Sequence, residues 1–87
     1  WTAPYYYRTS SGAEIDLLLE LPGGQLWAIE IKRALSPKVE RGFHVACEDL
    51  KPARRLVAYA GDERVPMPHD VEATGLYALA EELTQLS

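Results

Sequence analysis

The sequence predicts a small α/β (α+β) domain in which a three-stranded antiparallel meander is followed by a helix, a parallel strand and a C-terminal helix. Three observations predict this order. Two runs of alternating apolar and polar residues flank Pro22-Gly23-Gly24, an apolar stripe of helical period follows them, and a short, almost wholly apolar run comes next. Eighty-seven residues suffice for one small domain, which we place at residues 1–87.

The centre of the predicted fold is a β-hairpin that runs from Ser10 to Lys32. Its turn, Pro22-Gly23-Gly24, has two glycines that can adopt the positive φ that a hairpin loop requires. Loop length fixes the register, because a slip by one residue would move every side chain to the other face of the sheet. A three-residue loop sets these cross-strand pairs: Leu21 with Gln25, Asp16 with Glu30, and Glu14 with Lys32.

Strand alternation gives this hairpin one apolar and one charged face. The expected apolar face consists of Ile15, Leu17, Leu19, Leu21, Trp27, Ile29 and Ile31. The opposite face consists of Glu14, Asp16, Leu18, Glu20, Leu26, Ala28, Glu30 and Lys32. Carboxylates that face each other across a sheet are destabilising unless a cation or a proton lies between them. We therefore expect a divalent cation, Mg²⁺ or Mn²⁺, between Asp16 and Glu30, since carboxylate oxygens suit such ions.

A third strand is expected before the hairpin and a helix after it. Tyr5 to Thr9 predicts a strand that turns at Ser10-Ser11-Gly12 and pairs with the first hairpin strand. Ser36-Pro37 predicts the start of the helix, with serine as the N-cap and proline in the first helical position. The helix presents one apolar stripe to the sheet: Val39, Gly42, Phe43, Ala46, Cys47 and Leu50.

The second half of the chain completes a strand–helix–strand unit. Lys51-Pro52 ends the helix, because proline cannot continue its hydrogen bonds. Arg54 to Ala60 then predicts a strand parallel to the second hairpin strand, reached by a right-handed crossover. We expect a surface loop at residues 61–70, a short edge strand at residues 71–73 and a closing helix from Tyr77 to Leu86.

The composition, with 47% apolar and 25% charged residues, is that of a soluble globular domain. Cys47 is the only cysteine, so a reducing, cytoplasmic setting is expected. We expect Cys47 to be an inert core residue and both His44 and His69 to face solvent. The longest apolar run, Leu56 to Ala60, is far shorter than the ~20 residues of a membrane helix. A homodimer would add buried surface to so small a domain.

Charge is distributed unevenly along the chain. The net charge is −4, but residues 32–55 hold seven basic against three acidic side chains, a net charge of +4. This basic segment directly follows the acidic hairpin face, an arrangement that suits phosphate contacts beside a metal ion. The candidate nucleic-acid contacts are Arg8, Arg33, Lys38 and Arg41. The alternative is an ordinary solvated surface, with Arg8 paired to an acid on the neighbouring strand.

The spacing of Asp16, thirteen further residues and Glu30-x-Lys32 resembles the active-site signature of the PD-(D/E)XK nuclease-like superfamily. Together with Tyr6-Tyr7-Arg8-Thr9 and Gly12-x-Glu14, these residues are similar to a C-terminal domain of unknown function in a large family of bacterial and archaeal AAA-type ATPases. The resemblance covers roughly residues 5 to 60 and implies a restriction-endonuclease-like core. Ile15 replaces the usual proline, and the first helix of that core is missing before Trp1.

The resemblance also implies a reaction. Asp16 and Glu30 would hold Mg²⁺ with the carbonyl of Ile31, Lys32 would position the attacking water, and Glu14 would hold a second metal ion or the water network. The partners implied are DNA or another nucleic acid and an ATPase module in the same, longer chain, because the sequence lacks an initiating methionine and reads as a C-terminal fragment. The alternative is a non-catalytic interaction or recognition module that retains the nuclease fold.

Overall fold

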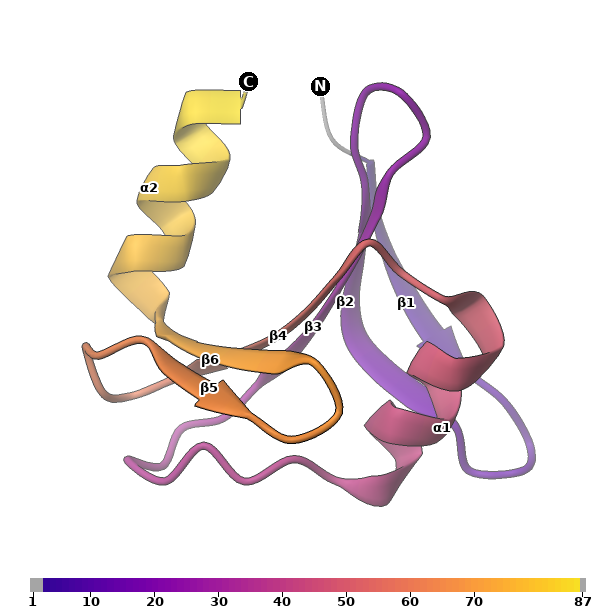
Figure 1. Cartoon of the computed structure of the whole chain (residues 1–87). Helices are drawn as coiled ribbons and strands as arrows, with labels where there is room; N and C mark the ends of the chain where they lie inside the picture. Colours follow the sequence, from indigo (N-terminus) through magenta and orange to yellow (C-terminus); the bar gives the residue numbers. More distant parts are fainter. Residues whose placement is uncertain (1–2, 87) are drawn as a thin grey trace.

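The computed structural model describes residues 3–86, so that residues 1, 2 and 87 of the predicted domain lie outside the described residues. One six-stranded mixed sheet carries a helix on each face (Figure 1). The elements are β1 (Ala3–Arg8), β2 (Glu14–Glu20), β3 (Leu26–Ile31), α1 (Arg41–Leu50), β4 (Arg54–Tyr59), β5 (Val65–Met67), β6 (Val71–Gly75) and α2 (Leu76–Leu86). Neither helix is long and apolar enough to span a membrane.

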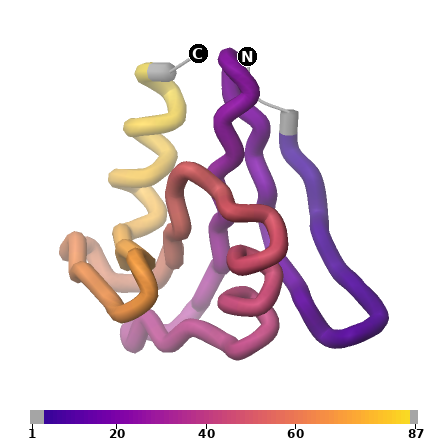
Figure 2. The backbone as a smooth tube through the Cα atoms, turned by 45° about the vertical axis from the view of Figure 1, so that its right-hand side comes forward, coloured from indigo at the N-terminus to yellow at the C-terminus, as the bar shows by residue number. Residues whose placement is uncertain are grey.

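The order of strands confirms the predicted meander, helix and parallel strand. The sheet runs β1-β2-β3-β4-β6-β5; β1, β2 and β3 are antiparallel, whereas β4 lies parallel to β3 and β6 parallel to β4. Strand β4 pairs with β3 after a crossover through α1, which packs on β2. Figure 2 shows α1 lying against the β2–β3 hairpin, with α2 separate from α1.

The hairpin register is also confirmed. Leu17 pairs with Ile29 and Leu19 with Trp27, and the backbone N–H of Leu21 donates to the carbonyl of Gln25 at 2.8 Å. The turn has φ values of +92° at Gly23 and +83° at Gly24, which glycine adopts without the steric penalty of other residues. The three-residue loop therefore sets the alignment that the sequence predicts.

Two apolar clusters lie on opposite faces of the sheet. The α1 cluster gathers Phe43, Ala46 and Cys47 of the helix against residues that include Ile15, Leu18 and Ala28. The α2 cluster gathers Leu79 against residues that include Leu19, Leu21, Trp27, Ile29 and Leu56. The helical stripe of α1 and the core position of Cys47 are thus confirmed. Burial raises the pKa of the Cys47 thiol to about 11, so the thiol stays protonated at neutral pH.

A β-bulge corrects the predicted face of Ile15. Tyr5 pairs with Leu18 but Tyr7 pairs with Ile15, so two steps along β1 match three steps along β2. The additional residue in β2 reverses the alternation beyond it. Ile15 consequently joins Leu18 in the α1 cluster and does not share a face with Leu19, which lies in the α2 cluster.

Helix α1 begins later than predicted. The predicted start at Ser36-Pro37 is wrong, because residues 32–40 form an irregular segment and the helix begins at Arg41. Backbone groups of this segment bond to the sheet: the carbonyl of Ala34 accepts from the N–H of Ala60 at 3.1 Å, and the N–H of Glu40 donates to the Glu30 carboxylate at 3.2 Å. These contacts between distant residues replace the first helical turn.

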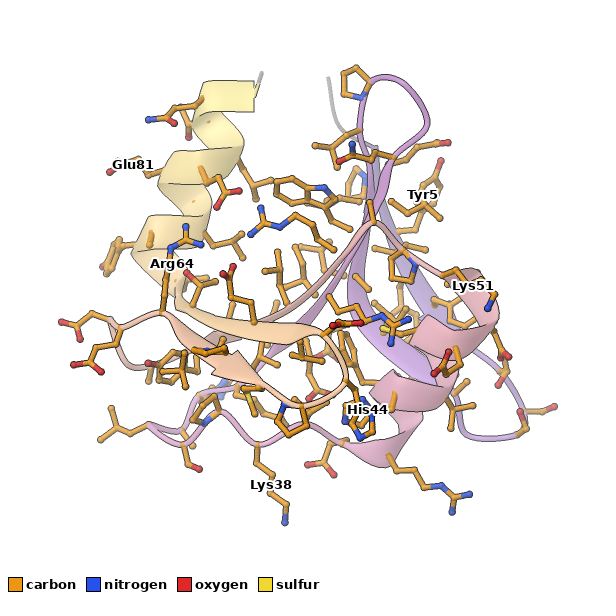
Figure 3. The ribbon with its side chains drawn as sticks, in the orientation of Figure 1. Tyr5, Lys38, His44, Lys51, Arg64 and Glu81 are labelled. Atoms are coloured by element: carbon orange, nitrogen blue, oxygen red, sulfur yellow. The ribbon has the colours of Figure 1, made fainter. Side chains whose placement is uncertain are left out.

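The C-terminal third differs from the prediction in two strands. The expected surface loop at residues 61–70 contains strand β5, because Val65–Met67 pairs with β6. Residues 71–73 were expected at an edge, but β6 lies between β4 and β5, and β5 is the edge strand. Pro66 in β5 lacks an N–H donor, and proline is tolerated in a strand mainly at a sheet edge. The closing helix is confirmed, since α2 spans Leu76–Leu86. It is tied to the sheet by Arg54 and Arg64, each of which contacts both Glu72 and Glu82. Figure 3 labels Arg64 beside α2.

Of the two histidines, His69 is exposed as predicted, whereas His44 departs from the prediction. His44 is only partly exposed and its ring meets that of His69, with the ring centroids 4.8 Å apart. The Nδ1 atom of His44 is buried and makes no hydrogen bond within the described residues. His69 and Asp70 have φ values of +63° and +61°, because they form the tight turn that brings β5 back to β6. The contact between α1 and this turn could not be read from the sequence.

Candidate functional site

The candidate site lies where β3 ends beside the bulge of β2. The backbone N–H of Lys32 donates to the carbonyl of Ala58 on β4 at 2.8 Å, so the peptide groups of even-numbered residues in β3 point toward β4 and those of odd-numbered residues toward β2. Ile31 accordingly donates its N–H toward β2, where Oδ2 of Asp16 accepts it at 3.0 Å. A side-chain carboxylate at the bulge thus takes the place of a backbone acceptor and ties Asp16 to the residue between Glu30 and Lys32.

Glu30 is a buried carboxylate, with 7% of the residue exposed. Its Oε2 accepts from the N–H of Glu40 at 3.2 Å and lies 3.9 Å from Nζ of Lys32. Burial raises the pKa of the Glu30 carboxyl, and the negative charge of Asp16 raises it further, whereas the bond from Glu40 and the charge of Lys32 lower it. A cation beside this group would stabilise its ionised form.

Lys32 lies between two carboxylates. Its Nζ is 2.9 Å from Oε1 of Glu40 in addition to its contact with Glu30. The hydrogen bond to Glu40 raises the pKa of Lys32, and the same bond lowers the pKa of Glu40. Lys32 is therefore an ammonium and Glu40 a carboxylate at neutral pH. We name Asp16, Glu30, Lys32 and Glu40 the carboxylate–lysine group.

Glu14 is not brought to this group, contrary to the expected pairing with Lys32. Its Oε1 accepts from Nε of Arg8 at 3.0 Å and from the hydroxyl of Tyr6 at 3.3 Å, both on β1. The carboxylates whose charges act on the pKa of Lys32 are Glu30, Glu40 and Asp16. The bulge explains the difference, because it sets Glu14 opposite Arg8 in the β1–β2 ladder.

The four basic residues predicted to contact nucleic acid have different surroundings. Arg8 is paired with Glu14 at 2.9 Å. The other three, Arg33, Lys38 and Arg41, are exposed and follow β3 up to the first residue of α1. The positive charge of Lys38 lowers the pKa of Glu40, which places Lys38 near the carboxylate–lysine group. Of these basic residues, Lys38 is the one whose charge acts on a carboxylate of the group.

The oxygen atoms that could ligate a cation here belong to Asp16, Glu30 and the backbone of Ile31. Among residues 3–86, no three His, Cys, Asp or Glu side chains are arranged to hold a metal ion. Asp16 and Glu30 each bond to a backbone N–H through Oδ2 and Oε2, which leaves Oδ1 and Oε1 as possible ligands, together with the Ile31 carbonyl on the β2 side. Mg²⁺ commonly takes only one or two protein carboxylates and completes its shell with water and phosphate oxygens.

Comparison with known proteins identifies the family. The family model described as "Domain of unknown function (DUF4143)" matches residues 1–79. The chain belongs to the DUF4143 family. Two relatives, "Uncharacterized protein Mb2031c" of Mycobacterium bovis and "Uncharacterized protein Rv2008c" of Mycobacterium tuberculosis, are each 41% identical to this DUF4143 domain over 69 residues. That span is 79% of the chain and 15% of each relative. No solved structure matches the chain significantly.

The family match agrees with the domain of unknown function that the sequence resembles, and it contains the entire carboxylate–lysine group. One member of the group in this DUF4143 domain, Glu40, was not predicted from the sequence. Glu40 lies in the segment predicted as the first helical turns, where a glutamate is an ordinary surface residue. Only the irregular path of residues 32–40 brings both its N–H and its carboxylate to Glu30 and Lys32.

Proposed function

We propose that this DUF4143 domain has a restriction-endonuclease-like core of the PD-(D/E)XK type and hydrolyses phosphodiester bonds in nucleic acid with Mg²⁺ or Mn²⁺. The observation that supports the proposal is the position of Glu30. This buried carboxylate is followed by Ile31, whose N–H donates to Asp16, and by Lys32, whose ammonium lies 3.9 Å from Glu30. A buried carboxylate beside another carboxylate and an ammonium is typical of a functional site.

Asp16, Glu30 and the Ile31 carbonyl would hold the cation. When bound, such an ion polarises a phosphoryl oxygen and lowers the pKa of its water. Ionised Glu30 is the form that a cation needs, and its burial leaves little competing solvent.

Lys32 acts on the substrate through its protons. An ammonium has three donors, of which one is engaged by Glu40 at 2.9 Å. The remaining donors would orient the attacking water and a non-bridging phosphoryl oxygen, where negative charge grows in the transition state. Glu40 fixes the position of the Nζ atom and, by raising the pKa of Lys32, keeps it charged.

A second function is favoured by the same Glu40 contacts. Glu40 bonds to Lys32 through its carboxylate and to Glu30 through its N–H, so these residues form a network that joins β3 to the start of α1. A domain that retained this network for stability alone would serve as a non-catalytic interaction or recognition module. Geometry alone does not confer an activity on a fold.

We also propose the larger setting. Because the matched span is 15% of each mycobacterial relative, this domain would work within a longer chain that carries an ATPase module, in the cytoplasm. A homodimer would bring two such domains together on one nucleic acid.

A cleavage assay tests the hydrolase proposal. Labelled single- and double-stranded DNA are incubated with the domain and with Mg²⁺, Mn²⁺ or EDTA. We expect metal-dependent cleavage that falls about 100-fold or more in Asp16→Asn and Lys32→Ala. The matched control is Glu14→Gln, which removes a carboxylate from the same strand but outside the carboxylate–lysine group, and it should cleave like the wild type. Equal activity in Asp16→Asn, or binding without cleavage in every metal, would support the non-catalytic module.

A further inference from the structure

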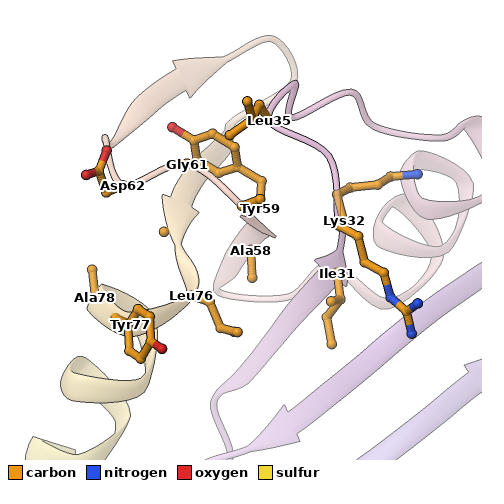
Figure 4. Close-up of a pocket in the computed structure, with 13 residues that line it drawn as sticks. Ile31, Lys32, Leu35, Ala58, Tyr59, Gly61, Asp62, Leu76, Tyr77 and Ala78 are labelled. Carbon is orange, nitrogen blue, oxygen red and sulfur yellow. The ribbon is translucent and has the colours of Figure 1, made fainter.

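A groove of about 860 Å³ opens at the carboxyl ends of β3 and β4 and at the start of α2. Figure 4 shows Ile31 at the end of β3 and Leu76 at the start of α2, with Tyr77 next to Leu76. Its walls are mostly apolar, and several of their side chains are strongly exposed: Tyr77 by 91%, Leu35 by 77% and Leu76 by 55%. Large apolar side chains gathered at an exposed recess mark a binding surface.

The groove adjoins the carboxylate–lysine group through two residues. Ile31 lines the groove with its half-exposed side chain while its N–H bonds to Asp16. Lys32 lines it as well, and Figure 4 shows its side chain extending away from Leu76, so that its Nζ reaches Glu30 and Glu40. A ligand whose phosphate lay at Lys32 would therefore place its next chemical group in the groove.

We infer that the groove receives an unpaired base of a single-stranded nucleic acid, beside the phosphate that the carboxylate–lysine group contacts. The inference deepens the proposed function and depends on it for the identity of the ligand. Bases stack on aromatic side chains, and this contact is tolerant of sequence. Tyr77 offers such a ring with almost all of its surface free. The volume of the groove lies within the range of ligand pockets.

Arg33 favours a nucleic-acid strand as the occupant. The charged residues of the groove are Lys32, Arg33 and Asp62. Nζ of Lys32 is already paired with Glu40, so the exposed Arg33 is the groove cation that a phosphate can reach. A polyanionic strand would complement Arg33. A base held in a duplex could not present its face to Tyr77.

Fluorescence anisotropy without divalent metal tests the inference independently of cleavage. The probes are a labelled 12-nucleotide single strand, the same strand with abasic positions, and the corresponding duplex. We expect the single strand to bind most tightly and Tyr77→Ala to raise its Kd about tenfold, while Tyr77→Phe retains affinity. The matched control is Tyr5→Ala, which removes a half-exposed tyrosine from β1, and its Kd should change less than twofold. In Arg33→Ala the salt dependence of binding should weaken by about one phosphate contact.

Several results would overturn the inference. The first is an equal Kd for Tyr77→Ala and Tyr5→Ala. The others are equal affinity for the single strand and the duplex, equal affinity for the abasic strand and the normal strand, or no binding of any probe. Light scattering that shows a dimer in the wild type and a monomer in Tyr77→Ala would assign the groove to a second copy. The proposed hydrolysis fails separately: if the wild type showed this Tyr77-dependent binding but cleaved no strand with Mg²⁺ or Mn²⁺, the groove would stand without the catalytic site.

Discussion

Nζ of Lys32 and Oε1 of Glu40 lie 2.9 Å apart and join the end of β3 to the residue before α1. The contact brings Glu40, which is ten positions away in sequence, into the same group as Glu30. It holds the lysine in place while leaving it charged. The contact is also solvent-accessible at Glu40, whose side chain is 63% exposed, so it should position Lys32 more than it stabilises the fold.

Replacing Glu40 by glutamine tests that distinction. Because an exposed ion pair contributes little to stability, we expect the urea midpoint of Glu40→Gln to stay close to that of the wild type. Under the proposed hydrolysis, cleavage should persist in Glu40→Gln but not in Lys32→Ala, since glutamine can still accept a hydrogen bond from Nζ. A loss of cleavage equal to that of Lys32→Ala would instead assign a direct role to the Glu40 charge.

Glu30 should make the fold sensitive to pH and to metal ions. Its folded pKa is raised above the ordinary 4.5, so the folded state binds the proton more tightly and stability falls as pH rises from 4.5 through the folded pKa. Glu30→Gln should therefore raise the melting temperature at pH 7 and lose this advantage below pH 4.5. In the wild type, Mg²⁺ should raise the melting temperature at pH 7, because the cation favours the ionised form. An equal Mg²⁺ effect in Glu30→Gln would contradict a cation at this site.

His44 should make the fold less stable as pH falls, which is the opposite of the effect of Glu30. Burial and then the nearby charges of His69 and Arg55 lower its pKa from 6.5, while Glu48 raises it. The unfolded state then binds the proton more tightly, so the stability that neutral His44 contributes is lost as pH falls from 6.5 through its folded pKa. Melting curves between pH 7.5 and pH 5 should show a smaller decrease in His44→Gln than in the wild type. Identical pH profiles would show that the contact with His69 does not oppose protonation.

Replacing Gly42 by alanine should destabilise the fold. A Cβ at this position would lie within 2.4 Å of the carbonyl oxygen of Gly12 in the β1–β2 turn. Alanine has the higher helix propensity, by up to ~1 kcal/mol, but the clash should outweigh it and destabilise the fold by about 1–3 kcal/mol in urea unfolding. Val45→Ala on the exposed side of the same helix is the control and should change stability by less than ~1 kcal/mol. A more stable Gly42→Ala would mean that α1 can shift away from the turn.

Local periodicity accounts for the features that the sequence predicts correctly. The three-residue turn and the period of two set the pairing of Leu19 with Trp27, and with it the approach of Asp16 to the strand that carries Glu30 and Lys32. The stripe of α1 and the extent of α2 follow from the helical period. Each depends on residues that are close in sequence, so a short window contains the information.

Tertiary structure alone decided the rest. The bulge that moves Glu14 to Arg8 depends on how β1 pairs with β2, and the late start of α1 depends on bonds from Ala60 and Glu30 to residues 34 and 40. The contact between His44 and His69 depends on the turn between β5 and β6. The sequence by itself therefore determined the three antiparallel strands, the parallel strand after them, the closing helix and three members of the carboxylate–lysine group. Packing between distant segments determined the fourth member, because backbone and carboxylate groups bond to whichever partners the folded chain brings within reach.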